Sequence, residues 1–419
     1  MHKIINEIRT DKLALATSIT ACVWVIIQIV LLILGWNYSI TPDEVEYTRN
    51  ALHVVDTHTL YPSKENLYDT FIHSPGVVNY IALLYAVFGS LRSEWIANIF
   101  MNIIILFEIF YIAKTFFNKK VGYIATIIYC TIVTTWFVPL HFLSDHPSFF
   151  LFLSGFCLSI QKKWYWVILG GVCYALGYTI RPTVLAYVVT SIVMLIILKR
   201  RWYYCLCLLL PYIGILYGIG KYFEKEMGVY VNSTYASGFC LKHAANEETW
   251  AGPNMTFAWH PNNSGYIENA NEKTFVEKDS IWKARTIEWI KDNPSRYALL
   301  APQRFFRSFA LDDWSTNDVF VKDAYGQAIN SKNPSRALTI LRIKQFMISI
   351  PYYFMLLLFI YSLFKYRKEL ISAKGVILLI TLLYAGTTPL TVAEHRSHYA
   401  FLFPMVIWAA YGIERKVRG

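Results

Sequence analysis

Long apolar stretches recur along almost the whole chain, and they constrain its fold more than any other feature. A helix needs about 20 apolar residues to cross the hydrocarbon core of a bilayer. The sequence contains about ten stretches that approach this length: Leu13–Gly35, Ile96–Phe116, Val121–Pro139, Phe149–Ile160, Trp164–Ile180, Thr183–Leu198, Trp202–Gly220, Phe346–Phe364, Gly375–Pro389 and Tyr399–Ile413. They predict an all-α polytopic membrane protein.

The composition supports this interpretation. Of the 419 residues, 55% are hydrophobic and 16% are charged, and the mean hydropathy is +0.37. An average soluble domain has roughly 25% charged residues, and a soluble protein does not leave large apolar patches facing water. The composition therefore argues against a cytosolic enzyme, a disordered chain and a fibrous repeat. Six of the seven cysteines lie in apolar runs, so no disulfide framework is expected.

Basic residues between the stretches predict the orientation of the chain. If the spans alternate, five connections fall on the same side as the N-terminus, and each carries lysine or arginine: Lys114, Lys119 and Lys120; Lys162 and Lys163; Lys199, Arg200 and Arg201; Lys365, Arg367 and Lys368; Arg415, Lys416 and Arg418. The positive-inside rule makes this side cytoplasmic. Both termini are then cytoplasmic, and much of the net charge of +11 is explained without a nucleic-acid partner.

Three regions follow from this topology. Residues 1–220 form an N-terminal membrane module with an outer loop at 36–95, residues 221–345 form a large outer loop, and residues 346–419 return to the membrane. The cytoplasmic loops are short, and no GxxxxGK[ST] phosphate loop is present, which argues against an ATP-driven transporter. The large loop is rich in aromatic residues, and we expect it to fold over a site and select an acceptor. Its tryptophans include Trp250, Trp259, Trp282, Trp289 and Trp314.

The segment directly after the first span contains a candidate general base. Thr41 is a suitable N-cap and Pro42 suits the first turn of a helix, so Asp43 and Glu44 stand at a helix N-terminus near the membrane surface. Two interpretations are equally compatible with the motif alone. The carboxylates either complement the helix dipole, or one of them accepts a proton from an acceptor as it attacks an activated carbon.

Cations at the outer ends of the spans are candidates for binding a phosphate. Arg181 follows the fifth span, and Arg396 precedes the last one. Arg304 and Arg307 lie on a predicted interfacial helix, where anchoring to lipid headgroups is the simpler interpretation. Asp145 faces the same side and either orients an acceptor or pairs with Arg181. The outer histidines match no compact zinc signature, so we predict no metal and no cofactor.

In their order along the chain, several motifs resemble those of the GT-C glycosyltransferases. Asp43-Glu44-x-x-Tyr47 resembles the Asp-Glu motif of this superfamily, which includes protein O-mannosyltransferases, lipid A aminoarabinose transferases and bacterial family 39 glycosyltransferases. Further matches are Ser74-Pro75-Gly76, Ser144-Asp145-His146-Pro147, Thr179-Ile180-Arg181-Pro182, Asp292 to Tyr297 and Glu394 to Tyr399. The segment His73 to Gly76 departs from the Glu-Lys-Pro-Pro segment of the aminoarabinose transferases, which argues against aminoarabinose as the sugar.

The resemblance implies a GT-C-like bundle of about ten transmembrane helices, with outer interfacial helices and a large outer loop. It also implies an integral-membrane glycosyltransferase that moves a sugar from a polyprenyl-phosphate donor to a lipid, glycan or protein acceptor on the outer face. Asp43 is then the general base of an inverting reaction, with Glu44 beside it. The implied substrate-binding residues are Tyr47, Asp145, His146, Arg181, Arg304, Arg307, Glu394, Arg396 and Tyr399.

Two alternatives remain. A flippase or transporter of lipid-linked glycans predicts inverted repeats and polar groups near the middle of the membrane, whereas the ionisable residues here gather at the outer ends of the spans. A polymerase or ligase acting on pyrophosphate-linked glycans also has many spans and a large outer loop, but the Asp-Glu motif directly after the first span favours the first hypothesis. The compact length favours a bacterial inner membrane.

Overall fold

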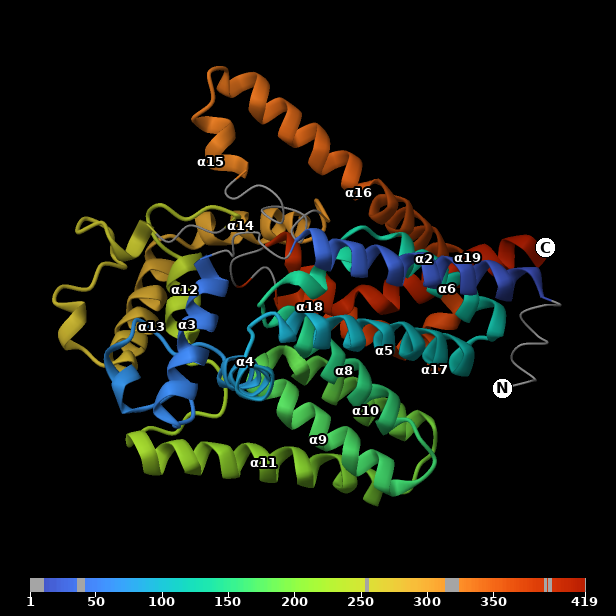
Figure 1. Cartoon of the computed structure of the whole chain (residues 1–419), viewed down its shortest axis with the longest axis horizontal. Coiled ribbons are helices and arrows are strands. Elements are labelled where there is room, and N and C mark those ends of the chain that lie inside the picture. The colour runs from blue at the N-terminus through green and yellow to red at the C-terminus, as the bar shows by residue number, and fades with distance from the viewer. Residues whose placement is uncertain are drawn as a thin grey trace.

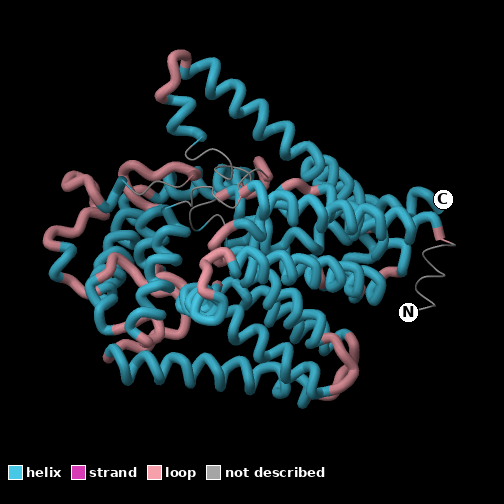
Figure 2. The backbone as a smooth tube through the Cα atoms, viewed as in Figure 1, coloured by secondary structure: helices cyan, strands magenta, loops and turns pink. Residues whose placement is uncertain are grey.

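The computed structural model describes residues 11–35, 42–252, 256–312, 324–387, 390 and 394–418, and this part of the chain is almost entirely helical (Figure 1, Figure 2). Thr41 and Trp314 lie outside it. The α-helices are α2 (Lys12–Leu34), α3 (Pro42–Thr57), α4 (Pro75–Phe88), α5 (Ser93–Phe116), α6 (Lys119–Thr131), α7 (Thr134–Phe137), α8 (Asp145–Ser159), α9 (Trp164–Ile180), α10 (Leu185–Ile197), α11 (Tyr203–Met227), α12 (Ser237–Ala244), α13 (Phe275–Asp292), α14 (Pro294–Arg307), α15 (Ala324–Ile329), α16 (Pro334–Lys365), α17 (Ala373–Val376), α18 (Leu378–Thr387) and α19 (Leu402–Arg418).

Several of these helices are suited to cross a membrane. By length and composition, four described helices qualify, namely α2, α5, α11 and α16, and a fifth span results if α6 and the segment Thr134–Leu140, bent by 75°, count as one. Shorter apolar helices include α4 and α9. The chain is therefore a multi-pass membrane protein with an all-α fold, while the count of about ten spans stays a prediction.

The core of the bundle is a set of enclosed helices surrounded by lipid-facing ones. Every residue of α19 from Leu402 to Tyr411 is buried, as is most of α8. Peripheral helices instead expose large apolar side chains, such as Ile33 on α2 and Leu357 on α16. Exposed apolar surface of this extent is expected where lipid replaces water. Glycine allows the closest contact inside: a Cβ on Gly171 of α9 would overlap the backbone of α11 at Leu208.

Helices of the two outer loops gather at one end of the bundle. In Figure 1, α3, α12 and α13 lie together beyond the ends of α2 and α5, while α11 extends below them, and α4 is seen end-on, so it runs across the direction of α5. The loops are joined by an antiparallel bridge between Ile72 and Tyr235 and by Lys278, whose Nζ donates to the Tyr68 carbonyl at 2.7 Å. The helix α4 begins directly after Ser74 and packs against α3 of the first of these loops.

Candidate active site

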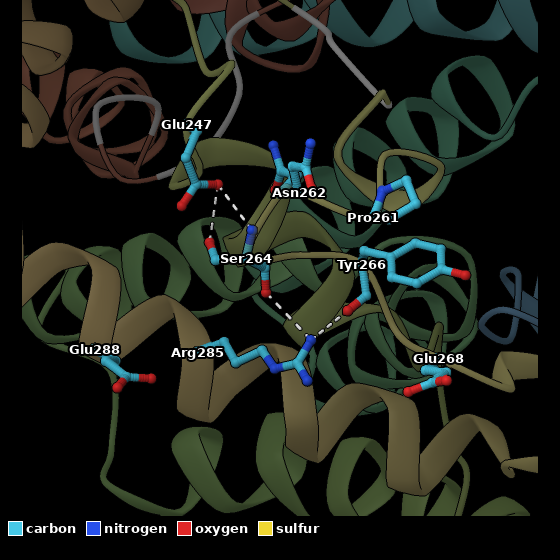
Figure 3. A pocket seen from close by; sticks show the side chains of 9 residues that line it. Glu247, Pro261, Asn262, Ser264, Tyr266, Glu268, Arg285 and Glu288 are labelled. Carbon is cyan, nitrogen blue, oxygen red and sulfur yellow. Dashed lines mark hydrogen bonds between the residues drawn. The ribbon is translucent and has the colours of Figure 1, made fainter.

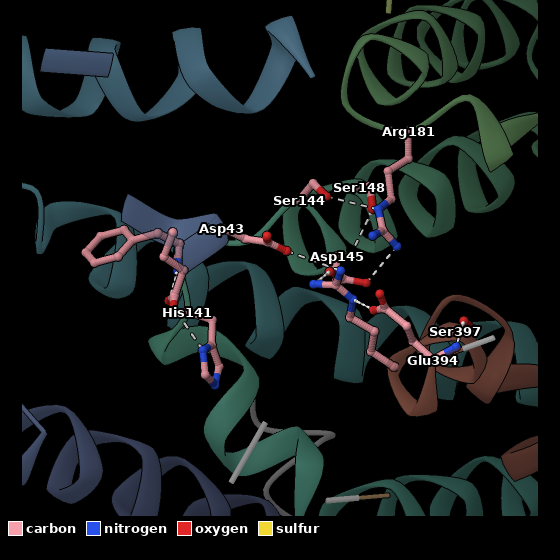
Figure 4. Close-up of polar contacts among 11 residues, drawn as sticks. Asp43, His141, Ser144, Asp145, Ser148, Arg181, Glu394 and Ser397 are labelled. Carbon is pink, nitrogen blue, oxygen red and sulfur yellow. Dashed lines mark hydrogen bonds and ion pairs between the residues drawn. The ribbon is translucent and has the colours of Figure 1, made fainter. Parts of the chain in front are cut away.

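Charged residues from four distant segments meet at this end of the bundle, which the charge pattern predicts to be the outer one. Asp43 comes from the first turn of α3, Asp145 from the first turn of α8, and Arg181 directly follows α9. Glu394 and Arg396 come from the start of the 3-10 helix η8 (His395–Phe401), which leads into α19. We call these five residues the carboxylate–arginine cluster (Figure 4). They are among the residues that the sequence singled out, and the fold brings them together.

Arg396 contacts all three carboxylates of the carboxylate–arginine cluster. Its Nε forms an ion pair with Glu394, its Nη2 lies 3.4 Å from Asp43 Oδ2, and its Nη1 lies 3.9 Å from Asp145 Oδ2. Burial lowers the pKa of the guanidinium, but Glu394, Asp145 and Asp43 outweigh burial and raise it above its ordinary value. Burial likewise raises the pKa of Glu394, and Arg396 more than reverses this effect. Each group thus keeps the other ionised.

Arg181 is the second cation of the carboxylate–arginine cluster, and it holds Asp145 from the other side. Its Nη1 donates to Asp145 Oδ1 at 2.6 Å, and its Nε donates to the Ser144 hydroxyl at 3.0 Å. The Asp145 side chain is only 2% exposed, while that of Arg181 is 28% exposed. The pair therefore combines a fixed, buried carboxylate with a guanidinium that still reaches the surface. Pairing, one of the two interpretations offered for Asp145, is what the structure shows.

Asp43 and Glu44 are neighbours in sequence but occupy different environments. The Asp43 side chain is 58% exposed, and its Oδ2 lies 3.4 Å from Nη2 of Arg396. Glu44 is fully buried: its Oε1 accepts a hydrogen bond from the backbone N–H of Phe142 at 2.8 Å and lies 3.3 Å from His141 Nδ1. Glu44 therefore fastens α3 to the segment before α8, whereas Asp43 is open to a substrate.

Tyr47 lies one turn after Asp43 and faces the same region. Burial and the nearby Asp43 carboxylate raise the pKa of the Tyr47 hydroxyl, so the phenol stays neutral. Its ring packs edge-on against His73, with 5.2 Å between the ring centroids. Burial lowers the pKa of His73, although Asp43 opposes this. The site wall beside Asp43 is thus formed by two rings that carry no charge near neutral pH.

His146 and Tyr399 lie beneath the carboxylate–arginine cluster. His146 is 1% exposed, its Nε2 bonds to the Asn98 carbonyl at 2.9 Å, and its Nδ1 bonds to the Tyr399 hydroxyl at 2.9 Å. A carbonyl can only accept, so Nε2 carries the proton and Nδ1 accepts from the phenol. This bond links α8 to η8. A supporting role fits this placement better than direct contact with a substrate, and the predicted substrate contact stays a prediction.

A second buried pair anchors η8, and the motifs did not point to it. His398 Nδ1 bonds to the Ser308 carbonyl at 2.9 Å, and its Nε2 lies 3.0 Å from Asp312 Oδ1. Its ring also stacks on Tyr352 of α16, with 4.6 Å between centroids. The ring thus joins η8 to Ser308 and Asp312, which follow α14, and to α16. It fixes the backbone two residues after Arg396.

Sequence reasoning also missed Glu94 and the hydrogen bond between Ser144, which is part of a matched motif, and Arg181. Glu94 lies in the first turn of α5 and is fully buried, with the Glu44 carboxylate and the Asn98 side chain as its neighbours. A carboxylate at the start of an apolar span is a functional candidate by default, so this signal was available. Ser144 carried no such signal, because its contact with Arg181 depends on how α8 and α9 pack.

Arg304 and Arg307 belong to a different environment, in the outer loop. Arg304 is fully buried, donates to the Ala244 carbonyl and lies 5.2 Å over the Tyr297 ring. Arg307 lies 4.8 Å over the ring of Trp250. These contacts pack α14 against the neighbouring loop segments. The structure therefore does not place these two arginines among the contacts of the carboxylate–arginine cluster.

The outer loop reaches the carboxylate–arginine cluster through α12. Burial lowers the pKa of His243 to about 4, with Glu394 raising it and Arg304 lowering it. His243 is therefore a neutral neighbour of both charged groups. This arrangement agrees with the expectation that the loop folds over the site, while its selection of an acceptor stays a prediction.

A polar pocket lies farther out in the same loop (Figure 3). It has a volume of about 740 Å³ and shares no lining residue with the carboxylate–arginine cluster. Glu247 accepts hydrogen bonds from the N–H and the hydroxyl of Ser264 at 2.9 and 3.0 Å, and Arg285 donates to the carbonyls of Ser264 and Tyr266. These bonds stabilise the pocket wall.

The described residues contain no group of three or more histidine, cysteine, aspartate or glutamate side chains arranged to hold a metal ion. In the carboxylate–arginine cluster, the three carboxylates are bridged by guanidinium groups. The arrangement offers a fixed positive field beside an accessible carboxylate. Such a field stabilises negative charge that develops on a leaving group.

No protein-family model matches the chain, and no curated protein matches it in sequence. Its structure is similar to that of the Archaeoglobus fulgidus oligosaccharyltransferase in the apo form, with a TM-score of 0.52 and 11% identity over 95% of this chain and 50% of that one. The same enzyme tethered to an acceptor peptide gives a TM-score of 0.49 at 10% identity, covering 96% and 49%. The chain thus spans about half the length of these structures. The apo comparison shows that it has a GT-C-like fold.

Proposed function

We propose that this chain is an integral-membrane glycosyltransferase that transfers a sugar from a polyprenyl-phosphate donor to an acceptor on the outer face. The observation that carries the proposal is the carboxylate–arginine cluster at these helix ends, in which the exposed Asp43 lies beside Arg396 and the buried Asp145 lies between Arg396 and Arg181. The GT-C-like fold supports it, and one solved structure of similar fold is a complex of an oligosaccharyltransferase with dolichol-phosphate.

Asp43 acts as the general base in this proposal. An acceptor hydroxyl or amine attacks the anomeric carbon of the donor, the bond between that carbon and the phosphate oxygen breaks, and the polyprenyl phosphate leaves with the electron pair. The proton of the acceptor passes to Asp43. Attack from the side opposite the phosphate inverts the anomeric configuration. Asp43 is the carboxylate suited to this role, because Asp145 is fixed by Arg181 and Glu44 is buried.

The arginines stabilise the leaving phosphate. Arginine forms bidentate, charge-assisted hydrogen bonds with phosphate oxygens, and Arg181 and Arg396 are already held in place by carboxylates. The contact of Arg396 with Asp43 involves the most exposed carboxylate of the cluster. We propose that a bound phosphate replaces Asp43 at this guanidinium. Donor binding would then release the base when the acceptor requires it.

The location and partners follow from the sequence pattern. We propose a multi-pass protein of a bacterial inner membrane with both termini in the cytoplasm, because the basic connections lie on the side of the N-terminus. The carboxylate–arginine cluster would then face the periplasm. The acceptor is a lipid, a glycan or a protein, and the reaction as proposed uses no resident metal or cofactor.

The decisive experiment is Asp43→Asn in purified protein supplied with polyprenyl-phosphate sugars and cell-envelope acceptors. The amide cannot accept the proton, so we expect kcat to fall by about 10²–10⁴-fold with an unchanged unfolding temperature. Glu46→Gln is the matched control, since it makes the same change on a partly exposed neighbour in α3 that forms an ion pair with Arg49. Normal turnover by Asp43→Asn would exclude the base assignment. Lipid translocation without transfer by the unaltered protein would favour a flippase instead.

A further inference from the structure

An apolar pocket opens beside the carboxylate–arginine cluster, between α4, α5, α8, α9 and α11. Its volume is about 590 Å³. Nearly all of its surface is hydrocarbon, and each of the five helices contributes to it, with Leu83, Met101, Leu151, Leu176 and Ile219 among the lining side chains. A pocket of this composition, in helices that face lipid, is suited to hold a hydrocarbon chain.

Three of the polar side chains in the wall, those of Asn79, Thr179 and Tyr80, already have hydrogen-bond partners in the protein. Asn79 accepts from the backbone N–H of Tyr61 at 3.0 Å and donates to the Tyr61 carbonyl at 2.7 Å. Thr179 donates to a carbonyl of its own helix at 2.7 Å, and the Tyr80 hydroxyl donates to Asn98 at 3.4 Å. The wall therefore offers little to a sugar or a peptide, whose buried polar groups would lose their partners.

The pocket leads directly to Arg181. Ile180 and Pro147 line it, and each is close in sequence to a member of the carboxylate–arginine cluster, Arg181 and Asp145 respectively. At Gly76, α4 approaches α9 so closely that a Cβ would overlap the Thr179 hydroxyl. This contact holds the start of α4 against the end of α9, directly before the guanidinium.

The pocket and η8 lie against different faces of α8, the helix that begins with Asp145. At about 3.6 residues per turn, Pro147 and Leu151 share one face of the helix, and both line the pocket. His146 and Phe149 lie on roughly the opposite face, where both contact Tyr399 of η8. Arg181 therefore stands on the pocket side of the site, and Arg396 stands on the η8 side.

We propose that this pocket binds the first isoprene units of the polyprenyl donor and that Arg181 binds its phosphate. The inference rests on the proposed function and adds the place of the donor. In the described part of the chain, the hydrogen bonds of Arg181 use Nε and Nη1, so Nη2 remains for a phosphate oxygen. Arg181 then holds the phosphate on the pocket side and Arg396 holds it from the η8 side. Asp43, released from Arg396, is left to face the acceptor.

Two glycines of α11 provide a matched test. Gly218 lines the pocket, and a Cβ added there would meet no atom within 4 Å, so we use Gly218→Leu to add a side chain to the pocket wall. Gly214 lies one turn earlier, also meets no atom within 4 Å, and does not line the pocket. Both changes favour the helix, so Gly214→Leu is the control. Leu83→Trp on α4, a half-exposed position in the opposite wall, is a second filling variant.

The assay measures labelling by a photoreactive polyprenyl monophosphate in nanodiscs. In the unaltered protein and in Gly214→Leu, we expect labelled peptides from α9 and α11, competed by unlabelled polyprenyl monophosphate and about tenfold less well by polyprenol, which lacks the phosphate. Gly218→Leu and Leu83→Trp should raise the half-saturating concentration about tenfold, because the chain loses several buried methylene contacts.

Three results would overturn the proposal. The first is equal labelling of Gly218→Leu and Gly214→Leu. The second is equal competition by phosphatidylglycerol, which would mean that the pocket holds bulk lipid. The third is unchanged donor labelling with weakened binding of a lipid acceptor. The assay requires no sugar transfer, so intact, selective labelling in a protein without turnover would contradict the glycosyltransferase proposal and leave the donor pocket supported.

Discussion

The four outer arginines that the sequence suggests as phosphate ligands divide into two pairs in the structure. Arg181 and Arg396 are held by carboxylates at the ends of membrane helices. Arg304 and Arg307 instead contact a backbone carbonyl and aromatic rings in the outer loop. The comparison teaches that a cation near a membrane surface becomes a candidate catalytic group only when its partners fix it beside a reactive carboxylate.

The largest effect on both activity and stability is expected for Arg181→Ala. It leaves the buried Asp145 carboxylate without its closest cation, which should cost about 3 kcal/mol of unfolding free energy and remove measurable transfer. Thermal unfolding in detergent and turnover with the donor lipid measure the two effects. Adding Asp145→Asn should restore the stability but not the activity. If Arg181→Ala is as stable as the unaltered protein, the ion pair between Arg181 and Asp145 does not stabilise the fold as proposed.

Arg396→Lys tests whether a positive charge at position 396 is sufficient for turnover. Lysine keeps the positive charge but cannot contact three carboxylates through a planar fork, so we expect turnover to fall by about 10²-fold and stability to change much less than in Arg181→Ala. Steady-state kinetics at saturating donor separates the two effects. Turnover equal to that of the unaltered protein would show that the geometry of the guanidinium is unimportant.

Arg304→Gln should affect the outer loop rather than the chemistry. The change removes a buried, charge-assisted hydrogen bond to the Ala244 carbonyl, at a cost of about 1–2 kcal/mol that is confined to the loop. Limited proteolysis should therefore cut the loop sooner, while turnover measured before cleavage falls less than threefold. A loss of turnover as large as that of Arg396→Lys would indicate that Arg304 takes part in catalysis. The division into catalytic arginines (Arg181 and Arg396) and loop arginines (Arg304 and Arg307) would then be wrong.

The smallest effect is expected for Arg307→Ala. This residue lies over the ring of Trp250, which is 46% exposed, so the contact is partly solvated. A cation–π interaction of this kind contributes about 0.5–1 kcal/mol. The unfolding temperature and turnover should both stay close to those of the unaltered protein. A strong loss of donor affinity would instead support the phosphate role that the sequence suggested.

Several residues of the site could be predicted because each lies next to an apolar stretch of the sequence. Asp43 follows a long apolar stretch and a proline, and Arg181 and Arg396 flank apolar stretches, so hydropathy and charge place them at one membrane face. The different roles of Asp43 and Glu44 could not be predicted. The N–H of Phe142, which binds and buries Glu44, lies far away in the chain.

The sequence by itself determined that the chain is helical, that it is a membrane protein, and where its ionisable residues collect, because these depend on composition and on the length of each apolar run. Only the tertiary structure decided which charges meet. Arg396 contacts Asp43 across more than 350 residues, His146 bonds to Tyr399 beneath them, and the apolar pocket exists only where five helices pack together. Such contacts depend on how the helices pack and on the glycines that let two helices come close together. The hydrophobic pattern of a single segment determines neither of these.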